Sequence, residues 1–214
     1  MSIKRVIIEG VESLEGILRG GAGKGGVVIC HPHPLYGGSM GNSVVEAMED
    51  GFSKAGFATV RFNFRGIGSS TGQYDNGDGE TQDVVAACRF LRGKVAGPGR
   101  FVLAGYSFGA WVSVRALAEV PFLTDLFLVA FPFSMGGTEG LRAFAGRIYL
   151  VGGSLDDISP LDDLLSLYKE LKGEKYLKVI PSSHFFAGRE TDISAFILEV
   201  FLPRLIDQGL PYIV

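Results

Sequence analysis

Long apolar runs, paired cysteines and basic clusters are all missing from this sequence. No apolar run approaches the roughly 18–20 residues that a membrane-spanning helix needs. The two cysteines, Cys30 and Cys88, are too few for a disulfide framework in 214 residues, and we expect buried thiols. Acidic and basic residues are interspersed at a net charge of −3. We therefore expect neither a membrane nor a nucleic acid as partner.

The N-terminal segment also lacks an export signal, because its apolar stretch is too short for the hydrophobic region of a secretory leader. We therefore expect a cytoplasmic protein. The hydrophobic content of 47% and charged content of 20% are those of an ordinary globular protein. The chain is long enough for one sizeable core and short for two, so a single domain is expected over residues 1–214.

Short β-rich apolar runs alternate with segments of helical periodicity along the chain. The predicted strands cover residues 3–9, 14–19, 26–31, 57–63, 101–104, 123–130, 147–151 and 176–180. The predicted helices cover residues 42–54, 80–94, 108–119, 161–171 and 193–206. This order predicts an α/β fold with a mainly parallel sheet of about eight strands, covered by helices on both faces. Ligands of such sheets bind beyond the carboxyl ends of the strands.

The pattern G-x-S-x-G occurs three times, around Ser39, Ser70 and Ser107. The pattern indicates a nucleophile only where a strand precedes the serine directly and a helix follows it. Ser39 lies well beyond the nearest strand, and Ser70 has loop on both sides. Ser107 alone has the required setting and is the predicted nucleophile. The alternative is a plain strand–helix junction that needs two glycines.

A serine hydroxyl needs a base to become a good nucleophile. His184 is the one histidine downstream of Ser107, and it follows the predicted strand 176–180. An acid that orients this base should follow the preceding strand, where Asp156 and Asp157 stand side by side. Position in the loop does not separate these two acids. We expect activity to fall at acid pH, because a protonated histidine cannot accept the serine proton.

Three segments in this order resemble the α/β-hydrolase superfamily: GYSFG (105–109), GGSLDDISP (152–160) and SHFF (183–186). HPHPLYGG (31–38) is similar to the HPHPxxGG signature of small bacterial hydrolases related to dienelactone hydrolase. The segments RFNFRGIGSSTG (61–72) and DNGDGE (75–80) also resemble that branch. Its members often carry a D-x-D-x-[IV]-x-P loop, whose second acid corresponds to Asp156, while Ser154 replaces the first. The resemblance therefore favours Asp156 over Asp157 as the triad acid.

The same resemblance implies an oxyanion hole built from two backbone N–H groups. One belongs to the residue after the nucleophile, Phe108. The other comes from the loop after the third strand, where Pro32 and Pro34 have no N–H to offer. His33 stands at the position that usually supplies this donor, with Leu35 as the reserve candidate.

Two other classes of function compete with this interpretation. The first is a metal-dependent hydrolase that uses His31, His33 and His184 as ligands. This arrangement would consume His184 and leave Ser107 without a base. The second is a non-catalytic binding module with a hydrolase fold, which a missing triad member would indicate, and no member is missing.

A group of aromatic residues and one loop segment each have both a functional and a structural interpretation. The aromatic residues expected near the site could form an acyl pocket or belong to the core: Tyr36, Phe131, Phe133, Phe185 and Phe186. The segment 75–80 could line the site, but we favour a role in capping the next helix, with Asp78 or Thr81 as the cap.

Together, the residues predict a serine hydrolase that cleaves a small carboxylic ester or thioester through an acyl-enzyme on Ser107. A peptide substrate is the third possibility, and no cofactor or metal is expected. The short connection between the strands near Ala130 and Arg147 predicts an open site without a helical cap. Whether the protein is a monomer or a homodimer stays open, and the apolar residues 210–214 could pack on their own domain or at a dimer contact.

Overall fold

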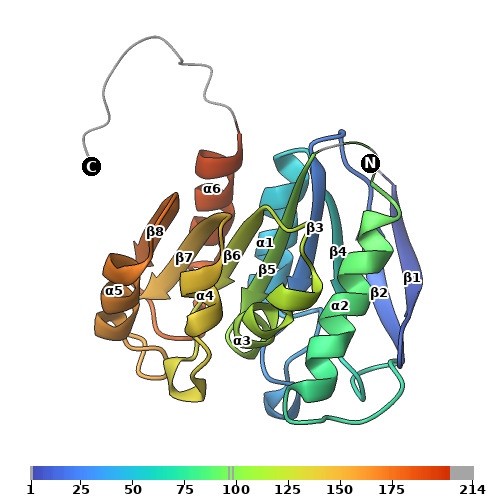
Figure 1. Cartoon of the computed structure of the whole chain (residues 1–214), viewed down its shortest axis with the longest axis horizontal. Helices are drawn as coiled ribbons and strands as arrows, with labels where there is room; N and C mark the ends of the chain where they lie inside the picture. Colours follow the sequence, from blue (N-terminus) through green and yellow to red (C-terminus); the bar gives the residue numbers. More distant parts are fainter. Residues whose placement is uncertain (1, 96, 98, 203–214) are drawn as a thin grey trace.

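An eight-stranded sheet forms the centre of the computed structural model, which describes residues 2–95, 97 and 99–202 (Figure 1). The strand order is β1-β2-β4-β3-β5-β6-β7-β8. β1 pairs antiparallel with β2, and β2 pairs antiparallel with β4, while the remaining neighbours are parallel. The strands are β1 (Ile3–Glu9), β2 (Ser13–Arg19), β3 (Gly25–Cys30), β4 (Ala58–Phe62), β5 (Arg100–Tyr106), β6 (Asp125–Val129), β7 (Arg147–Gly153) and β8 (Lys175–Ile180).

Helices cover both faces of this sheet (Figure 1). One face carries α1 (Ser43–Lys54) and α6 (Glu190–Phe201). The other carries α2 (Asp78–Arg92), α3 (Phe108–Arg115), α4 (Glu139–Ala143) and α5 (Leu161–Glu170). None of these described helices has the length and apolar character that crossing a bilayer requires.

Alternating side chains of the central strands build a separate core on each face. In β3, Val27 and Ile29 pack on the side of α1 and α6, while Val28 and Cys30 pack on the side of α2 and α3. Successive strand residues point to opposite faces, so a strand buried on both sides must be apolar throughout. This explains the continuous apolar run of β3 and confirms the predicted parallel sheet covered on both faces.

Each predicted strand and helix overlaps an observed element, with differences at the ends. The predicted helix 108–119 is α3 followed by a 3₁₀ turn, Ala116–Glu119. The last helix begins at Glu190 rather than at residue 193, and residues 203–206 of that prediction lie outside the described part, as do residues 210–214. Between β6 and β7 the described chain forms only a 3₁₀ turn, Phe133–Met135, and the five-residue α4. The predicted lack of a helical cap is confirmed for this connection.

The start of α2 differs from its predicted cap. The N-cap is Gly77, and neither Asp78 nor Thr81 takes that place. The Glu80 carboxylate accepts the Gly77 N–H at 2.8 Å, which satisfies a donor that the helix leaves unpaired. Gly77 has a φ of 94°, and a Cβ there would lie 2.2 Å from the ring of Trp111 in α3. Close packing of α2 on α3 therefore requires glycine at this cap.

A buried carboxylate ties three strands together at the amino-terminal end of the sheet. Asp125 begins β6 and accepts hydrogen bonds from Arg100 of β5 at 3.0 Å and from Arg147 of β7 at 2.7 Å. Burial alone would raise the pKa of Asp125, but the hydrogen bonds from the two guanidinium groups outweigh it and lower that pKa. The ion pairs therefore stabilise the charged form of a fully buried group.

We expect Asp125→Ala to lower the free energy of unfolding by about 3 kcal/mol, because two guanidinium groups lose their partner. The exposed pair of Asp50 and Lys54 is the control, and Asp50→Ala should cost less than about 0.5 kcal/mol. Urea unfolding measures both. Because the pKa of Asp125 is lowered on folding, its contribution is present at neutral pH and is lost as pH falls below about 4 toward the folded pKa. Equal losses in the two variants would contradict this interpretation.

Candidate active site

Ser107 lies at the sharp junction between β5 and α3. Its backbone has a φ of 54° and a ψ of −119°, a conformation that residues other than glycine seldom adopt. The N–H of Ser107 donates to the Val129 carbonyl of β6 at 2.9 Å, which ties the junction to the sheet. Strained backbone of this kind persists only where the surroundings hold it, and such positions gather at functional sites.

The two glycines of this motif are required by close backbone packing. A Cβ on Gly105 would lie 2.4 Å from the Gly109 carbonyl oxygen. A Cβ on Gly109 would lie 2.4 Å from the carbonyl oxygen of Cys30, the last residue of β3. Neither space admits a side chain, so the spacing G-x-S-x-G is what allows α3 to begin directly beside β3.

The other two motif serines have structural partners instead. The Ser39 hydroxyl accepts the Gly41 N–H at 3.3 Å. The buried Ser70 hydroxyl donates to the Asn63 carbonyl at 2.8 Å and accepts the Glu15 N–H at 3.0 Å. Of the three serines, Ser107 alone has a histidine as a hydrogen-bond partner.

His184 lies between Ser107 and Asp156. Its Nε2 is 2.9 Å from the Ser107 Oγ, and its Nδ1 is 3.0 Å and 2.9 Å from the two Asp156 carboxylate oxygens. His184 and Asp156 are both buried. The Tyr106 hydroxyl donates to the His184 carbonyl at 2.8 Å and anchors the loop after β8. The segments that follow β5, β7 and β8 thus bring the Ser107 hydroxyl, the Asp156 carboxylate and the His184 imidazole together, with the imidazole hydrogen-bonded to both of the other groups.

The acid loop distinguishes the two neighbouring aspartates. Asp156 Oδ1 accepts the N–H groups of Ile158 at 2.9 Å and Ser159 at 2.7 Å, so its carboxylate is held in one orientation. Asp157 is exposed and lies on the surface of the loop. Only Asp156 contacts His184 among these two residues.

The turn 33–38 holds the candidates for the second oxyanion donor. Five of its residues carry an N–H, and four of these donate within the turn. The Leu35 N–H donates to His33 Nδ1, those of Tyr36 and Gly38 to the His33 carbonyl, and that of Gly37 to the Pro34 carbonyl. The remaining N–H, that of His33, has no acceptor among the described residues. The Leu35 amide is therefore occupied, and the His33 amide remains available.

Phe108 lies next to this turn. The two rings of His33 and Phe108 have centroids 4.8 Å apart. Phe108 is the first residue of α3, so its N–H has no acceptor within the helix. The two amides proposed from the sequence therefore belong to Phe108, which directly follows Ser107, and to His33, whose ring contacts the Phe108 ring.

His31 cannot serve as a metal ligand in this arrangement. Its Nε2 accepts the Phe64 N–H at 3.1 Å, and its Nδ1 donates to the Pro32 carbonyl at 2.7 Å. Burial lowers the pKa of His31 to about 4, because the charged ring would lose its hydration. In the part of the chain that the structure describes, no three His, Cys, Asp or Glu side chains are grouped to hold a metal ion. The alternative of a site built from His31, His33 and His184 is therefore wrong.

The aromatic residues near the site fall into two groups. Phe131 and Phe186 are fully buried core residues. Tyr36 of the turn 33–38 is 86% exposed, and Phe185, which directly follows His184, is 65% exposed. The core interpretation therefore holds for Phe131 and Phe186, Phe133 is half-buried, and the two exposed rings are available to a substrate.

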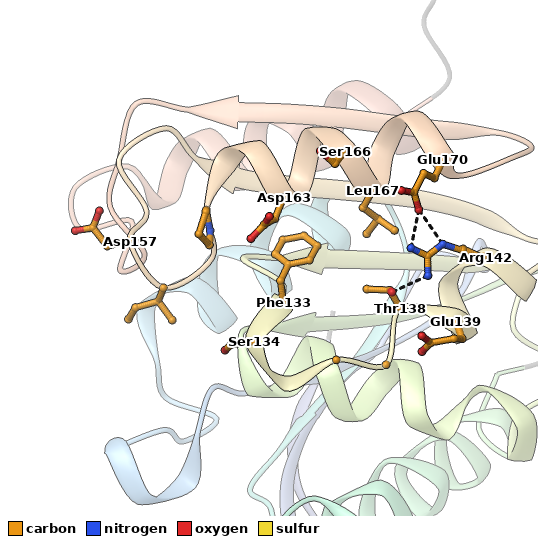
Figure 2. A pocket seen from close by; sticks show the side chains of 14 residues that line it. Phe133, Ser134, Thr138, Glu139, Arg142, Asp157, Asp163, Ser166, Leu167 and Glu170 are labelled. Atoms are coloured by element: carbon orange, nitrogen blue, oxygen red, sulfur yellow. Dashed lines mark hydrogen bonds and ion pairs between the residues drawn. The ribbon is translucent and has the colours of Figure 1, made fainter.

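A groove lies beside the acid loop, between the chain after β6 and helix α5 (Figure 2). Its volume is about 720 Å³. Figure 2 shows the Phe133 ring over its centre and the ion pair of Arg142 with Glu170, 2.6 Å long, at one end. Asp157 lines the other end, whereas Ser107 and His184 do not line the groove. This groove therefore does not contain the Ser107 hydroxyl.

Comparison with known proteins places these features in a family. The family model of X-Pro dipeptidyl-peptidases (S15 family) matches residues 25–136, just over half of the chain. This match includes Ser107 and the turn 33–38, but it ends before Asp156 and His184. The branch related to dienelactone hydrolase, which the sequence resembles, is not the family that matched.

Two solved structures and one protein sequence are similar over most of the chain. An α/β serine hydrolase homologue from Coxiella burnetii is 33% identical with a TM-score of 0.85, covering 93% of this chain and 97% of the other. An α/β serine hydrolase without a lid from Xanthomonas campestris is 28% identical with a TM-score of 0.83, covering 93% of both. An uncharacterized protein of Rickettsia prowazekii is 28% identical over 179 residues, which cover 79% of this chain and 75% of that protein.

We expect the buried His31 to make stability depend on pH. Its folded pKa of about 4 lies below the usual value of 6.5, so the unfolded chain binds an extra proton between these values. Stability is therefore retained above pH 6.5 and declines toward pH 4, by about 2 kcal/mol between pH 7 and pH 5. Urea unfolding of the wild type and His31→Gln, whose amide oxygen can accept the Phe64 N–H without titrating, measures this. The same pH dependence in both would contradict it.

Proposed function

The chain belongs to the α/β serine hydrolases of the X-Pro dipeptidyl-peptidase (S15) family, and from that premise we propose a reaction. The protein hydrolyses a small carboxylic ester or thioester through an acyl-enzyme on Ser107. The observation that supports this most strongly is the contact of His184 with Ser107 on one side, at 2.9 Å, and with Asp156 on the other. Hydrogen-bond distance is what proton transfer between nucleophile and base requires.

The first half of the reaction forms the acyl-enzyme. Ser107 Oγ attacks the substrate carbonyl while His184 Nε2 accepts its proton. The Asp156 carboxylate stabilises the imidazolium and keeps Nδ1 protonated. The N–H groups of Phe108 and His33 donate to the oxyanion, and each such donor typically contributes about 3–4 kcal/mol. His184 then protonates the leaving group, and the bond between carbonyl carbon and leaving group breaks.

The second half releases the acid. A water molecule takes the place of the leaving group and gives a proton to His184 as its oxygen attacks the acyl carbon. The ester bond to Ser107 breaks, and the serine oxygen regains the proton from His184. The cycle needs no cofactor, since every proton is moved by groups that already lie in contact.

Peptide-bond hydrolysis is the second candidate, because the matching family is named for X-Pro dipeptidyl-peptidases. The short connection between β6 and β7 favours the ester, since it leaves the site open and offers few ordered subsites for a peptide. A panel of esters, thioesters and X-Pro peptide amides separates the two. Lactones belong in that panel because residues 31–38 resemble the signature of the dienelactone-hydrolase branch.

The expectations on partners and location remain predictions. We propose that the partner is a small acyl substrate, with no nucleic acid and no membrane involved. The acidic net charge of −3 offers no electrostatic attraction to phosphate-rich surfaces. We also propose a cytoplasmic location, because the N-terminal apolar stretch is short, and a single domain over residues 1–214, because the chain length suits one core.

A fluorophosphonate probe should label the wild-type protein at Ser107, because the activated hydroxyl attacks phosphorus as it would a carbonyl. Ser107→Ala should abolish labelling and lower kcat/KM by about 10³-fold or more. Ser39→Ala is the matched control from another G-x-S-x-G and should keep both. Peptide mapping by mass spectrometry locates the label, and a label on any other serine would contradict the proposal.

Neighbouring aspartates provide a second test. We expect Asp156→Asn to lower kcat by about 10³- to 10⁴-fold, because the amide favours the wrong tautomer of His184. Asp157→Asn should stay within about threefold of the wild type, since its side chain is exposed and away from the histidine. Steady-state kinetics on the preferred ester measures both. Comparable losses in the two variants would contradict the assignment of the acid.

A further inference from the structure

The side chain of His33 fills the space between the turn 33–38 and helix α3. It is half-buried, and its ring lies against three aromatic rings. The centroid distances are 4.7 Å to Tyr36, 5.2 Å to Tyr74 and 4.8 Å to Phe108. The ring thus connects the turn to Phe108, the residue that follows the nucleophile, and to the segment before α2.

Both ring nitrogens of His33 have partners, and these partners define its tautomer. Nδ1 accepts the Leu35 N–H at 3.2 Å, so Nδ1 carries no proton. The proton of the neutral ring is therefore on Nε2, which donates to the Tyr74 hydroxyl at 3.3 Å. A protonated ring would bring two N–H groups face to face at Leu35. Only the neutral ring fits this turn.

The backbone of the same residue is also tied into the turn. The His33 carbonyl accepts the N–H groups of Tyr36 at 3.1 Å and Gly38 at 3.0 Å. Gly38 lies so close to the preceding chain that a Cβ would be 2.0 Å from the Pro32 carbonyl oxygen. Side chain and carbonyl of His33 together bind three of the four amides that donate within the turn. This arrangement leaves the His33 N–H as the amide without an acceptor.

We propose that the His33 side chain is a positioning residue, whose unprotonated Nδ1 holds the turn 33–38 so that its own backbone N–H reaches the oxyanion on Ser107. The inference rests on the proposed function and adds a role for a side chain that the backbone mechanism does not use. Oxyanion donors act only within about 2.7–3.1 Å of the developing charge, so a small displacement of the turn weakens the reaction. The ring acts on the rate through the backbone and does not contact the substrate carbonyl.

The groups around the ring keep it neutral in the working range. Burial lowers the pKa of His33, and the charge of Glu80 in α2 partly opposes that effect. Tyr36 of the turn and Tyr74 before α2 face the ring with their phenol groups, and Phe108 of α3 adds no charge. Activity at acid pH therefore requires two unprotonated histidines, His184 as base and His33 as support.

Two substitutions separate the role of the acceptor from that of ring volume. In His33→Asn the amide oxygen lies the same number of bonds from the backbone as Nδ1, so it can accept the Leu35 N–H. His33→Leu keeps a side chain of comparable size without an acceptor. We expect His33→Leu to lower kcat on the preferred ester at least ~10-fold with KM within ~2-fold, because an oxyanion donor acts in the transition state. His33→Asn should stay within ~3-fold of wild-type kcat.

The pH profile adds a readout that a merely structural role would not change. At the acid end, the wild-type rate should fall more steeply than the first power of proton concentration, because protonation of His184 stops the reaction and protonation of His33 slows it further. His33→Asn should fall with the first power, since its amide does not titrate. The substrate should be an ester without ionisable groups, so that its own titration does not contribute to the pH profile. Identical slopes in the two proteins would overturn the proposal.

Further outcomes decide the remaining cases. Wild-type kcat in His33→Leu overturns the proposal, and so does a loss in His33→Asn as large as that in His33→Leu. If thermal melting shows that His33→Leu does not fold, His33→Gln replaces it, because its acceptor lies one bond further out. An active His33→Asn together with a His33→Gln at least ~10-fold slower supports the proposal, and equal rates in these two variants overturn it.

The proposed function can fail separately from this inference. A wild-type protein that neither turns over an ester nor is labelled at Ser107 refutes the hydrolase mechanism itself. A wild-type protein that is labelled and active, with His33→Leu unaffected, refutes only the role of the His33 side chain.

Discussion

The approach of Gly109 to the end of β3 determines where every other part of the site can lie. With the Cys30 carbonyl oxygen 2.4 Å from where a Cβ would stand, α3 starts in direct contact with β3. The turn 33–38, which continues from β3, is thereby brought beside Phe108, and the two rings lie 4.8 Å apart. Ser107 is left in a strained conformation at the edge of the sheet, held by its hydrogen bond to Val129. Nucleophile and oxyanion donors thus depend on a single close contact between backbones.

The remaining two members of the site reach Ser107 because neighbouring parallel strands end at the same edge. β7 and β8 pair in parallel up to Gly153 and Ile180, and the pairing continues into the loops. The Ser154 N–H donates to the Ile180 carbonyl at 2.9 Å, and the Leu155 N–H donates to the Ser182 carbonyl at 3.0 Å. The loop that carries Asp156 and the loop that carries His184 are therefore joined to each other by their own backbone hydrogen bonds, independently of their contact with Ser107. Asp156 and His184 form a supported pair that orients one imidazole nitrogen toward Ser107.

The two histidines of the HPH segment have a spacing that is compatible with zinc binding, but in this structure they accept backbone hydrogen bonds. His31 and His33 both use a ring nitrogen to accept a backbone N–H, that of Phe64 in one case and that of Leu35 in the other. A nitrogen that accepts such a hydrogen bond has no lone pair left for a metal. The two residues act as neutral acceptors that shape the loop after β3. Their spacing is compatible with zinc, and only the contacts of the ring nitrogens distinguish the two uses.

Sequence alone determined the features that depend on neighbouring residues. Local periodicity predicts the order of strands and helices and the strand–turn–helix setting of Ser107. His184 could be identified as the base because it is the one histidine downstream of Ser107. Tertiary contacts decided the rest. Asp156 and Asp157 are adjacent and equal in chemistry, and the resemblance favoured Asp156, but which carboxylate meets the histidine depends on the loop that follows β7. Likewise Gly77 caps α2 because Trp111 from another helix fills the space where a side chain would stand. Periodicity records which face of an element is apolar, whereas the partner of a given polar atom depends on residues far away in the chain.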